Sequence, residues 1–210
     1  MTERVHTSKA DDRIEAQRQR ILAAAQKCFV EHGFHAASMA TIADTAQMSA
    51  GLIYRYFKSK SEIIQAIIGR QLEATRDKLG QMHASTVTDM TAGIIESLDE
   101  QGPCDEHSMN GALFMEMSAE ATRDPQIATA LRAFDAAVRS EVANWLSRRK
   151  EQGGYGLPQD IVPARALLFV CLIEGLKVRI TREPGIDRAL IESALSEILP
   201  VLLEPAHKDC

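Results

Sequence analysis

The segment from Met48 to Lys60, MSAGLIYRYFKSK, concentrates hydrogen-bond donors and positive charge in an otherwise acidic chain. Tyr54 and Tyr56 each carry a phenolic donor, and Lys58 and Lys60 each carry an ammonium group. Such groups donate to the phosphate oxygens of nucleic acids and thereby position a protein on the duplex. The segment therefore predicts a phosphate-binding surface. The alternative is that both tyrosines pack in a small helical core and the lysines are solvated.

Short helices are expected to position these side chains. Ser49 can cap a helix that runs to about Phe57, and Ser38 can cap a short helix just before it. Ile53 and Phe57 are four residues apart, so they share the face expected to point inward with Met48. Two short helices with a tight connection predict a helix-turn-helix, whose second helix reads the major groove of DNA.

Longer helices are expected on either side of this pair. Apolar residues at helical spacing predict a first helix from Asp11 or Asp12 onward. That helix should end at Gly33 in a left-handed conformation, with Phe34 folding back onto the last turn. The residues SKSE, 59–62, form a capping box that predicts a fourth helix over 59–80.

Charge is distributed unevenly along the 210 residues, whose net charge is −5. Residues 1–80 carry a net charge of +3, whereas residues 81–210 carry −8. Such a division indicates that the N-terminal part binds a polyanion while the remainder has a different function. The alternative is that the uneven distribution arose by chance.

The run from Arg20 to Ile64 resembles the DNA-binding domain of TetR-family transcriptional regulators along its whole length. The residues that carry the resemblance are the A-x-x-x-F-x-x-x-G-F spacing, TIA at 41–43, GLIYRYF and KSKSE. The resemblance implies an all-α protein, with a helix-turn-helix DNA-binding domain over 1–58 and an effector-binding and dimerisation domain over 59–210. It implies a cytoplasmic homodimer that binds a palindromic double-stranded DNA operator. We expect a repressor released by a small-molecule effector of unknown identity; an activator or a corepressor-dependent protein stays open.

The resemblance also implies roles for particular residues. Phosphate contacts fall on Tyr54, Tyr56 and Lys60, assisted by Ser38 and Thr41. Base-facing positions fall on Ser49, Ala50 and Gly51. These three side chains are too short for bidentate base pairing, so specificity is expected from thymine methyl contacts, from Arg55 or from DNA shape.

The C-terminal part is expected to be helical over 86–98, 109–122, 125–150, 161–181 and 187–203. Asp124 can cap the third of these helices with Pro125 at its first position. The last two helices are strongly apolar, which favours a four-helix dimer interface. Its expected residues are Leu168, Leu176, Ile191, Leu195 and Ile198; the alternative is the core of a monomer.

A ligand cavity is the least specific prediction. Aromatic and thioether side chains on two neighbouring helices can line a cavity, although such residues more often fill a core. The residues proposed for this effector pocket are Phe114, Met117, Phe134 and Trp145, with Glu116, Glu120 or Glu174 as a candidate polar anchor.

Other classes of protein fit the sequence poorly. Cys104, Asp105, Glu106 and His107 lie close together, but their spacing does not match a zinc site, so no metal and no cofactor is expected. No nucleophile elbow, phosphate-binding glycine loop or H-E-x-x-H pattern indicates an enzyme. The four scattered cysteines suit a reducing cytoplasm. No apolar run is long enough for a signal peptide or a membrane span.

Overall fold

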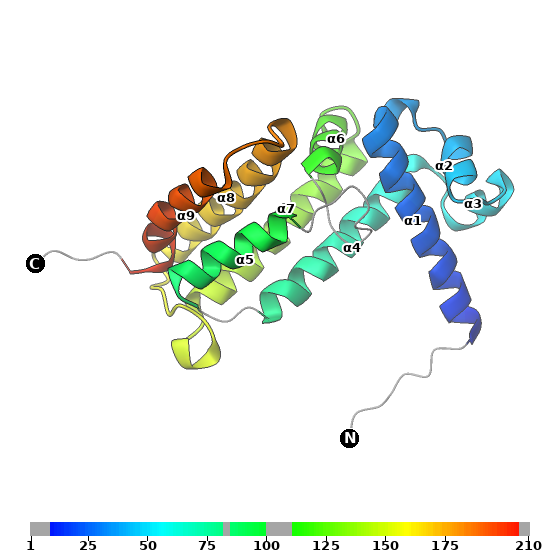
Figure 1. Ribbon diagram of the computed structural model, residues 1–210. Helices are drawn as coiled ribbons and strands as arrows, with labels where there is room; N and C mark the ends of the chain where they lie inside the picture. Colours follow the sequence, from blue (N-terminus) through cyan, green and yellow to red (C-terminus); the bar gives the residue numbers. More distant parts are fainter. Residues whose placement is uncertain (1–8, 82–84, 100–110, 206–210) are drawn as a thin grey trace, which may run out of the picture. The chain divides into compact units, whose positions relative to one another are not determined.

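The computed structural model describes residues 9–81, 85–99 and 111–205, and these residues form an all-helical structure (Figure 1). The helices are α1 (Lys9–Ala36), α2 (Met39–Thr45), α3 (Ala50–Tyr56), α4 (Lys60–Gln81), α5 (Val87–Asp99), α6 (Gly111–Ala121), α7 (Pro125–Ser147), the short 3₁₀ helix η1 (Lys150–Gln152), α8 (Val162–Arg182) and α9 (Arg188–Leu203). The expected all-α class is confirmed. Among the described helices, none combines the length and the apolar character needed to cross a bilayer.

The chain divides into two compact units between Ile67 and Ile68. The division falls inside α4, so the first two turns of this helix belong to unit 1 and the rest belongs to unit 2. The functional domains expected over 1–58 and 59–210 stay a prediction, because a compact unit and a functional domain need not share a boundary.

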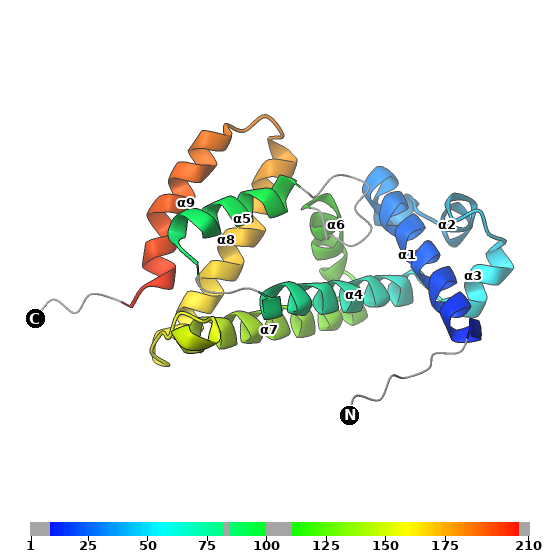
Figure 2. The same ribbon diagram turned by 60° about the horizontal axis from the view of Figure 1, so that its bottom comes forward.

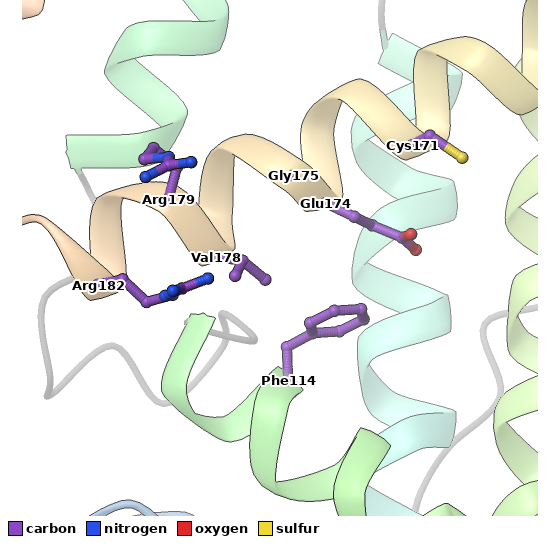
Figure 3. A pocket seen from close by; sticks show the side chains of 7 residues that line it. All are labelled: Phe114, Cys171, Glu174, Gly175, Val178, Arg179 and Arg182. Atoms are coloured by element: carbon purple, nitrogen blue, oxygen red, sulfur yellow. The ribbon is translucent and has the colours of Figure 1, made fainter.

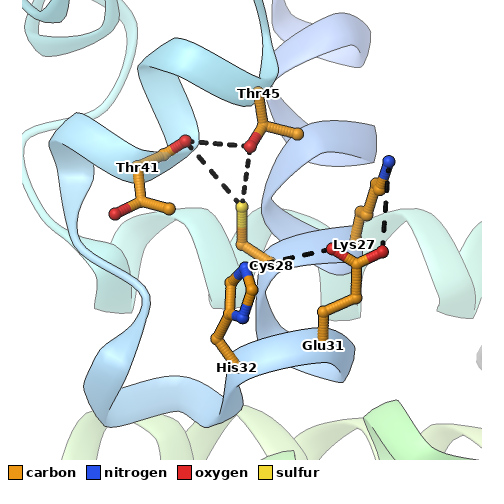
Figure 4. Close-up of polar contacts among 6 residues, drawn as sticks. All are labelled: Lys27, Cys28, Glu31, His32, Thr41 and Thr45. Atoms are coloured by element: carbon orange, nitrogen blue, oxygen red, sulfur yellow. Dashed lines mark hydrogen bonds and ion pairs between the residues drawn. The ribbon is translucent and has the colours of Figure 1, made fainter.

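Unit 1 is built by α1, α2, α3 and the start of α4, with α2 packed against both α1 and α3. Its fully buried apolar side chains are Ile21, Ala25, Ala37, Ile42, Ile53, Ile63 and Ile67. Cys28 contributes to the α1–α2 contact, where its Sγ lies 3.2 Å from Thr45 Oγ1 and 3.9 Å from the Thr41 carbonyl oxygen (Figure 4). Thr45 Oγ1 also donates to the Thr41 carbonyl oxygen at 2.9 Å, a bond within α2, so the Cys28 Sγ is the group that joins α1 to α2 here.

Gly33 interrupts α1 as the sequence predicts, but with a different backbone conformation. Its φ of 76° is positive, which only glycine adopts readily, whereas its ψ of 160° lies outside the expected left-handed helical region. The expected left-handed cap is therefore wrong in ψ, because the chain turns sharply here and resumes helical structure to Ala36. Phe34 does fold back, with its ring centroid 5.3 Å from that of Phe29.

Three predicted helix caps are present. The Ser38 side chain accepts from Thr41 N, the Ser49 side chain accepts from Leu52 N, and the Asp124 side chain accepts from the first turn of α7. At the start of α4, Ser59 Oγ accepts from Glu62 N at 3.2 Å, as a capping box requires. The Glu62 carboxylate, however, accepts from Lys58 N at 2.6 Å, one residue before the position that a standard box uses.

Unit 2 is a bundle in which α7 packs on α6 and α8, and α5 lies against α9 (Figure 2). Its core contains Trp145, whose ring makes edge contacts with Tyr155 at 5.0 Å and Phe169 at 5.6 Å between centroids. The Tyr155 hydroxyl in turn donates to the Ser85 carbonyl oxygen at 3.3 Å, which ties the loop after α7 to the residue two positions before α5.

The acidic and thiol cluster of residues 104–107, together with the first residues of the helix expected from 109, lies outside the described residues. No group of three or more His, Cys, Asp or Glu side chains within the described ranges is placed to hold a metal ion.

Candidate functional site

Helix α3 presents one continuous exposed face. Ile53 and Phe57 are buried in the core of unit 1, so the opposite side of the helix faces solvent. That side carries Ala50, Gly51, Tyr54 and Arg55, and 48% of the Tyr54 surface is exposed. A Cβ added at Gly51 would meet no atom of the chain within 4 Å, so packing within the chain does not require a glycine at this position. The face is open to an external surface.

Hydroxyl groups line the helix starts beside this face. Ser38 and Ser49 are both exposed N-caps, and each uses an oxygen lone pair to accept a backbone N–H. Ser38 Oγ and Thr41 Oγ1 lie 2.8 Å apart, so one of these hydroxyls donates to the other. The remaining hydroxyl hydrogen can point outward to a phosphate oxygen.

Lys58 and Lys60 both donate hydrogen bonds to backbone carbonyl oxygens of unit 1. Lys60 Nζ donates to the Phe34 carbonyl oxygen at 2.7 Å and lies 4.4 Å from the centre of the Phe34 ring. Lys58 Nζ donates to the Tyr54 carbonyl oxygen at 3.1 Å. Lys60 thus joins the end of α1 to the start of α4, a structural role that the sequence did not indicate. Tyr56 is half-buried, in contrast to Tyr54.

The turn of the helix-turn-helix contains a residue that sequence reasoning missed. Gln47 has a φ of 53°, and it is the only residue other than glycine with a positive φ in the described part of the chain. Its Oε1 accepts a hydrogen bond from Arg20 Nη2 at 3.2 Å, which links α1 to the turn between α2 and α3. Glutamine is uncommon in this conformation, and nothing in the local sequence marks the position.

Of the four residues expected in an effector pocket, Phe114 lines the cavity that the structure describes (Figure 3). Phe114 lines a cavity of about 320 Å³ between α6 and α8, together with Glu174, Val178 and Arg182. Met117 and Trp145 are 1% and 0% exposed in the core, and Phe134 is half-buried; none of the three lines this cavity. Of the cavity-lining residues on α8, the sequence indicated only Glu174, as a candidate polar anchor; the others share no aromatic or thioether character.

The residues expected at a dimer interface divide into two groups. Leu168 and Ile198 are exposed at the surface, and Leu176 is half-buried. Ile191 and Leu195 lie in the core of unit 2, with 7% and 1% of their surfaces exposed, so their apolar character is used within the chain itself.

Ionisable side chains of α7 and α8 influence one another beside the cavity. Burial raises the pKa of Glu174, and the nearby Asp135 carboxylate raises it further. Burial also raises the pKa of Asp135 and lowers the pKa of Lys177. All three shifts favour the uncharged forms, because burial in this part of unit 2 destabilises the charged forms of these side chains.

Two family models cover most of the chain. Residues 21–67 match the model described as bacterial regulatory proteins of the tetR family. Residues 89–204 match the model described as the C-terminal part of BetI-type transcriptional repressors.

Individual proteins agree with these matches. The HTH-type transcriptional regulator UidR of Escherichia coli (strain K12) is 35% identical over 147 residues, which cover 66% of this chain and 70% of UidR. The HTH-type transcriptional activator FasR of Mycolicibacterium smegmatis is 28% identical over 134 residues, covering 64% of this chain and 60% of FasR. The solved structure of Salmonella enterica GusR superposes with a TM-score of 0.72 at 25% identity, covering 95% of this chain and 99% of GusR.

Proposed function

The chain belongs to the TetR family of bacterial regulatory proteins, and from this membership we propose that it is a homodimeric repressor that leaves its operator when a small molecule binds unit 2. The broader statement, that the protein is a DNA-binding transcriptional regulator and not an enzyme, follows from the family itself. It would act in the cytoplasm, where bacterial DNA is located.

The exposed face of α3 is the single observation that best supports DNA binding as the activity. Tyr54 offers an exposed phenol, and Ser49 and Gly51 let the helix start approach a groove wall closely. In a helix-turn-helix the N-terminal residues of the second helix contact base edges. The phosphate contacts would come from Tyr54, Tyr56, Ser38 and Thr41, with Lys60 adding charge.

Apolar side chains on the surfaces of α8 and α9 support the dimer. Leu167 and Leu168 on α8 and Leu190 and Val201 on α9 are each about half exposed, and Ile198 is exposed to a smaller extent. On α9, Leu190, Ile198 and Val201 recur at helical spacing on one exposed side of the helix. Large apolar side chains grouped on an outer surface mark an association site in soluble proteins. A second protomer that covers α8 and α9 would supply a second copy of α3, one for each half-site of a palindromic operator.

The helix α4 provides a route by which a ligand can affect DNA binding. It begins in unit 1 and continues into unit 2, so a ligand that moves its C-terminal part can act on the DNA-binding domain through it. Two half-sites lie about 34 Å apart, one helical turn of DNA, so a change in the spacing of the reading helices costs contacts at both. The ligand shifts this balance only by its difference in affinity for the two states.

Repression, rather than activation, is supported by the description of the C-terminal family model, whereas the relative FasR is named an activator. Transcription in vitro from the promoter upstream of the protein's own coding region decides between them. We expect transcripts to fall as the protein is added, and to fall less when that promoter's operator is scrambled. An increase in transcripts would contradict the proposed repressor function.

A further inference from the structure

The two ends of α3 are held in unit 1 to different degrees. At the C-terminal end, Phe57 is 2% exposed, and the Arg18 guanidinium carbon lies 4.6 Å from the centre of its ring. At the N-terminal end, residues 49–51 are exposed, and the first buried side chain is that of Ile53. Since the N-terminal residues of the second helix contact bases in a helix-turn-helix, the end expected to read DNA is the less firmly held one.

The position of this end depends on the turn between α2 and α3, which has the hydrogen bonds of a Schellman motif. Gln47 N donates to the Asp44 carbonyl oxygen at 3.0 Å, and Met48 N donates to the Ala43 carbonyl oxygen at 2.9 Å. The motif needs a residue with positive φ just after the helix cap, and this residue is usually glycine, because a side chain makes that conformation strained. Here Gln47 adopts it, with a φ of 53°. The turn that leads into α3 therefore contains a strained residue.

Strained residues persist where the surrounding structure holds them in place, and they often occur at functional sites. Arg20 on α1 supplies such a restraint, since its Nη2 donates to Gln47 Oε1 at 3.2 Å. A glycine at position 47 would adopt the same backbone conformation without strain, but it would have no side chain for α1 to bind. Gln47 thus gives the turn a link to α1 that glycine could not provide.

The residues expected to face the bases make the orientation of α3 important. Ser49, Ala50 and Gly51 have short side chains or none, so their contacts depend on how closely the backbone of α3 approaches the groove. A long, flexible side chain can compensate for a shift of its helix, whereas these residues cannot. Groups that recognise a ligand have to be held within about 0.5 Å of their productive positions. A small rotation of α3 would therefore cost contacts with a preferred sequence.

We propose that Arg20 and Gln47 are positioning residues for DNA recognition. Their hydrogen bond lets α1 fix the N-terminal end of α3 in the orientation that discriminates one DNA sequence from another. Phosphate contacts carry no sequence information directly and come from other residues of unit 1, so loss of this bond affects discrimination more than non-specific affinity. The consequence for discrimination rests on the proposed function, whereas the restraint on the turn does not.

The test compares sequence discrimination with stability. The unaltered full-length protein first selects a preferred duplex from a random-sequence library, and discrimination is the ratio of its affinities for this duplex and for a scrambled one. Gln47→Met keeps an unbranched side chain but removes the acceptor, and Gln47→Gly also removes the backbone strain. Both variants are expected to lower discrimination about tenfold, with little change in binding to scrambled DNA, because one hydrogen bond to a charged group is lost. Gln47→Gly is nevertheless expected to unfold at the same or a higher urea concentration than the unaltered protein.

Further variants show whether the two residues act as a pair. Arg20→Met is expected to lower discrimination as much as Gln47→Met, and the double variant no further, because the same hydrogen bond is lost in each. Gln47→Glu keeps an acceptor for Arg20 and is expected to retain discrimination, although its charge weakens binding to both duplexes. Lys27→Met controls for the loss of a positive charge on α1 and is expected to leave discrimination unchanged, since Lys27 is exposed and its Nζ lies 3.9 Å from the Glu31 carboxylate.

Hydrogen exchange measured by NMR tests the restraint on the turn without DNA. The amide hydrogens of Met48 and Leu52 form hydrogen bonds in the turn and at the start of α3. Both are expected to exchange about tenfold faster in Arg20→Met and in Gln47→Met, because local opening becomes easier when the bond is lost. The amide of Ile63, which is bonded to the Ser59 carbonyl oxygen at the start of α4, is the control and should exchange at the same rate.

Unchanged exchange at Met48 in both variants would overturn the proposal, as would faster exchange with undiminished discrimination. An equal loss of affinity for both duplexes would show a direct phosphate contact and would also overturn it. So would independent, multiplying losses from Arg20→Met and Gln47→Met. If the library contained no preferred duplex, the proposed function would be contradicted, while the exchange rates would still decide whether Arg20 restrains the turn.

Discussion

At the scale of single residues, Lys60 combines a structural and a proposed DNA-binding role. Its ammonium group donates to the Phe34 carbonyl oxygen and lies over the Phe34 ring, so it stabilises the junction of α1 and α4. The same positive charge would attract a phosphate group of bound DNA. Loss of this lysine should therefore affect folding and DNA binding together, whereas loss of an exposed contact residue should affect binding alone.

Lys60→Gln is expected to reduce the slope of log affinity against log salt by about 0.9, because one phosphate contact releases about one counterion. It is also expected to lower the free energy of unfolding by about 1–3 kcal/mol, since a charged hydrogen bond is lost. Anisotropy titrations at several salt concentrations and urea unfolding measure the two effects. Tyr54→Phe is the control, with weaker binding to every duplex and unchanged stability. An unchanged salt slope for Lys60→Gln would remove this lysine from the DNA contacts.

Glu174 is expected to make stability depend on pH. Its pKa in the folded protein is raised above the ordinary value of 4.5, so its contribution to stability is fully present below pH 4.5 and is lost as the pH rises through the folded pKa. Glu174→Gln, which resembles the protonated acid, is therefore expected to be more stable than the parent at neutral pH.

Urea unfolding above and below pH 4.5 tests this expectation, with the gain from Glu174→Gln disappearing on acidification. Glu192→Gln is the control, because its exposed ion pair with Arg188 at 3.8 Å contributes little. A loss of stability at neutral pH in Glu174→Gln would show that attraction to Lys177 outweighs burial and the repulsion from Asp135.

At the scale of elements, helix–helix crossings depend on particular glycines. Gly111→Ala is expected to push α6 away from α8, because the added Cβ overlaps Thr181 Oγ1 and comes within 2.5 Å of the Lys177 carbonyl oxygen. A loss of about 1–3 kcal/mol is expected from thermal or urea unfolding, as for other cases of overpacking.

Gly93→Ala is the control for this change, since an added Cβ on α5 meets nothing within 4 Å. It is expected to raise stability by up to about 1 kcal/mol, because alanine is the better helix former. If the two substitutions had the same effect, α6 would not depend on close contact with α8.

The elements themselves could largely be predicted from sequence, whereas the cavity could not. Caps at Ser38, Ser49 and Asp124 follow from local hydrogen bonding, which the neighbouring residues reveal. The cavity depends on which side of α8 meets α6, a tertiary relation between segments about sixty residues apart. For the same reason, helical spacing placed Leu195 on an apolar face but could not say whether that face met the chain's own core or a partner.

At the scale of the whole molecule, the proposed dimer depends on the exposed side chains of α8 and α9. Leu168→Glu is expected to dissociate the dimer without unfolding the protomer. Leu168 is 54% exposed in the single chain, so a charge there does not disturb the core. Sedimentation velocity and circular dichroism measure the two properties. Leu195→Glu, by contrast, is expected to unfold unit 2, since this residue lies in the core.

Ile14→Glu controls for the general effect of a charge on an exposed apolar residue, because Ile14 is 50% exposed on α1. It is expected to leave the dimer intact. A folded dimer of the Leu168→Glu variant would place the interface elsewhere.

Binding of the protein to DNA is the central claim, and fluorescence anisotropy tests it most directly. The DNA upstream of the protein's own coding region is titrated at several salt concentrations beside a scrambled duplex of equal length. We expect the upstream DNA to bind about a thousandfold more tightly than the scrambled duplex at physiological salt, with both affinities falling steeply as salt rises. Equal weak binding to both duplexes, or no binding at any salt concentration, would contradict the assignment of α3 as an operator-reading helix.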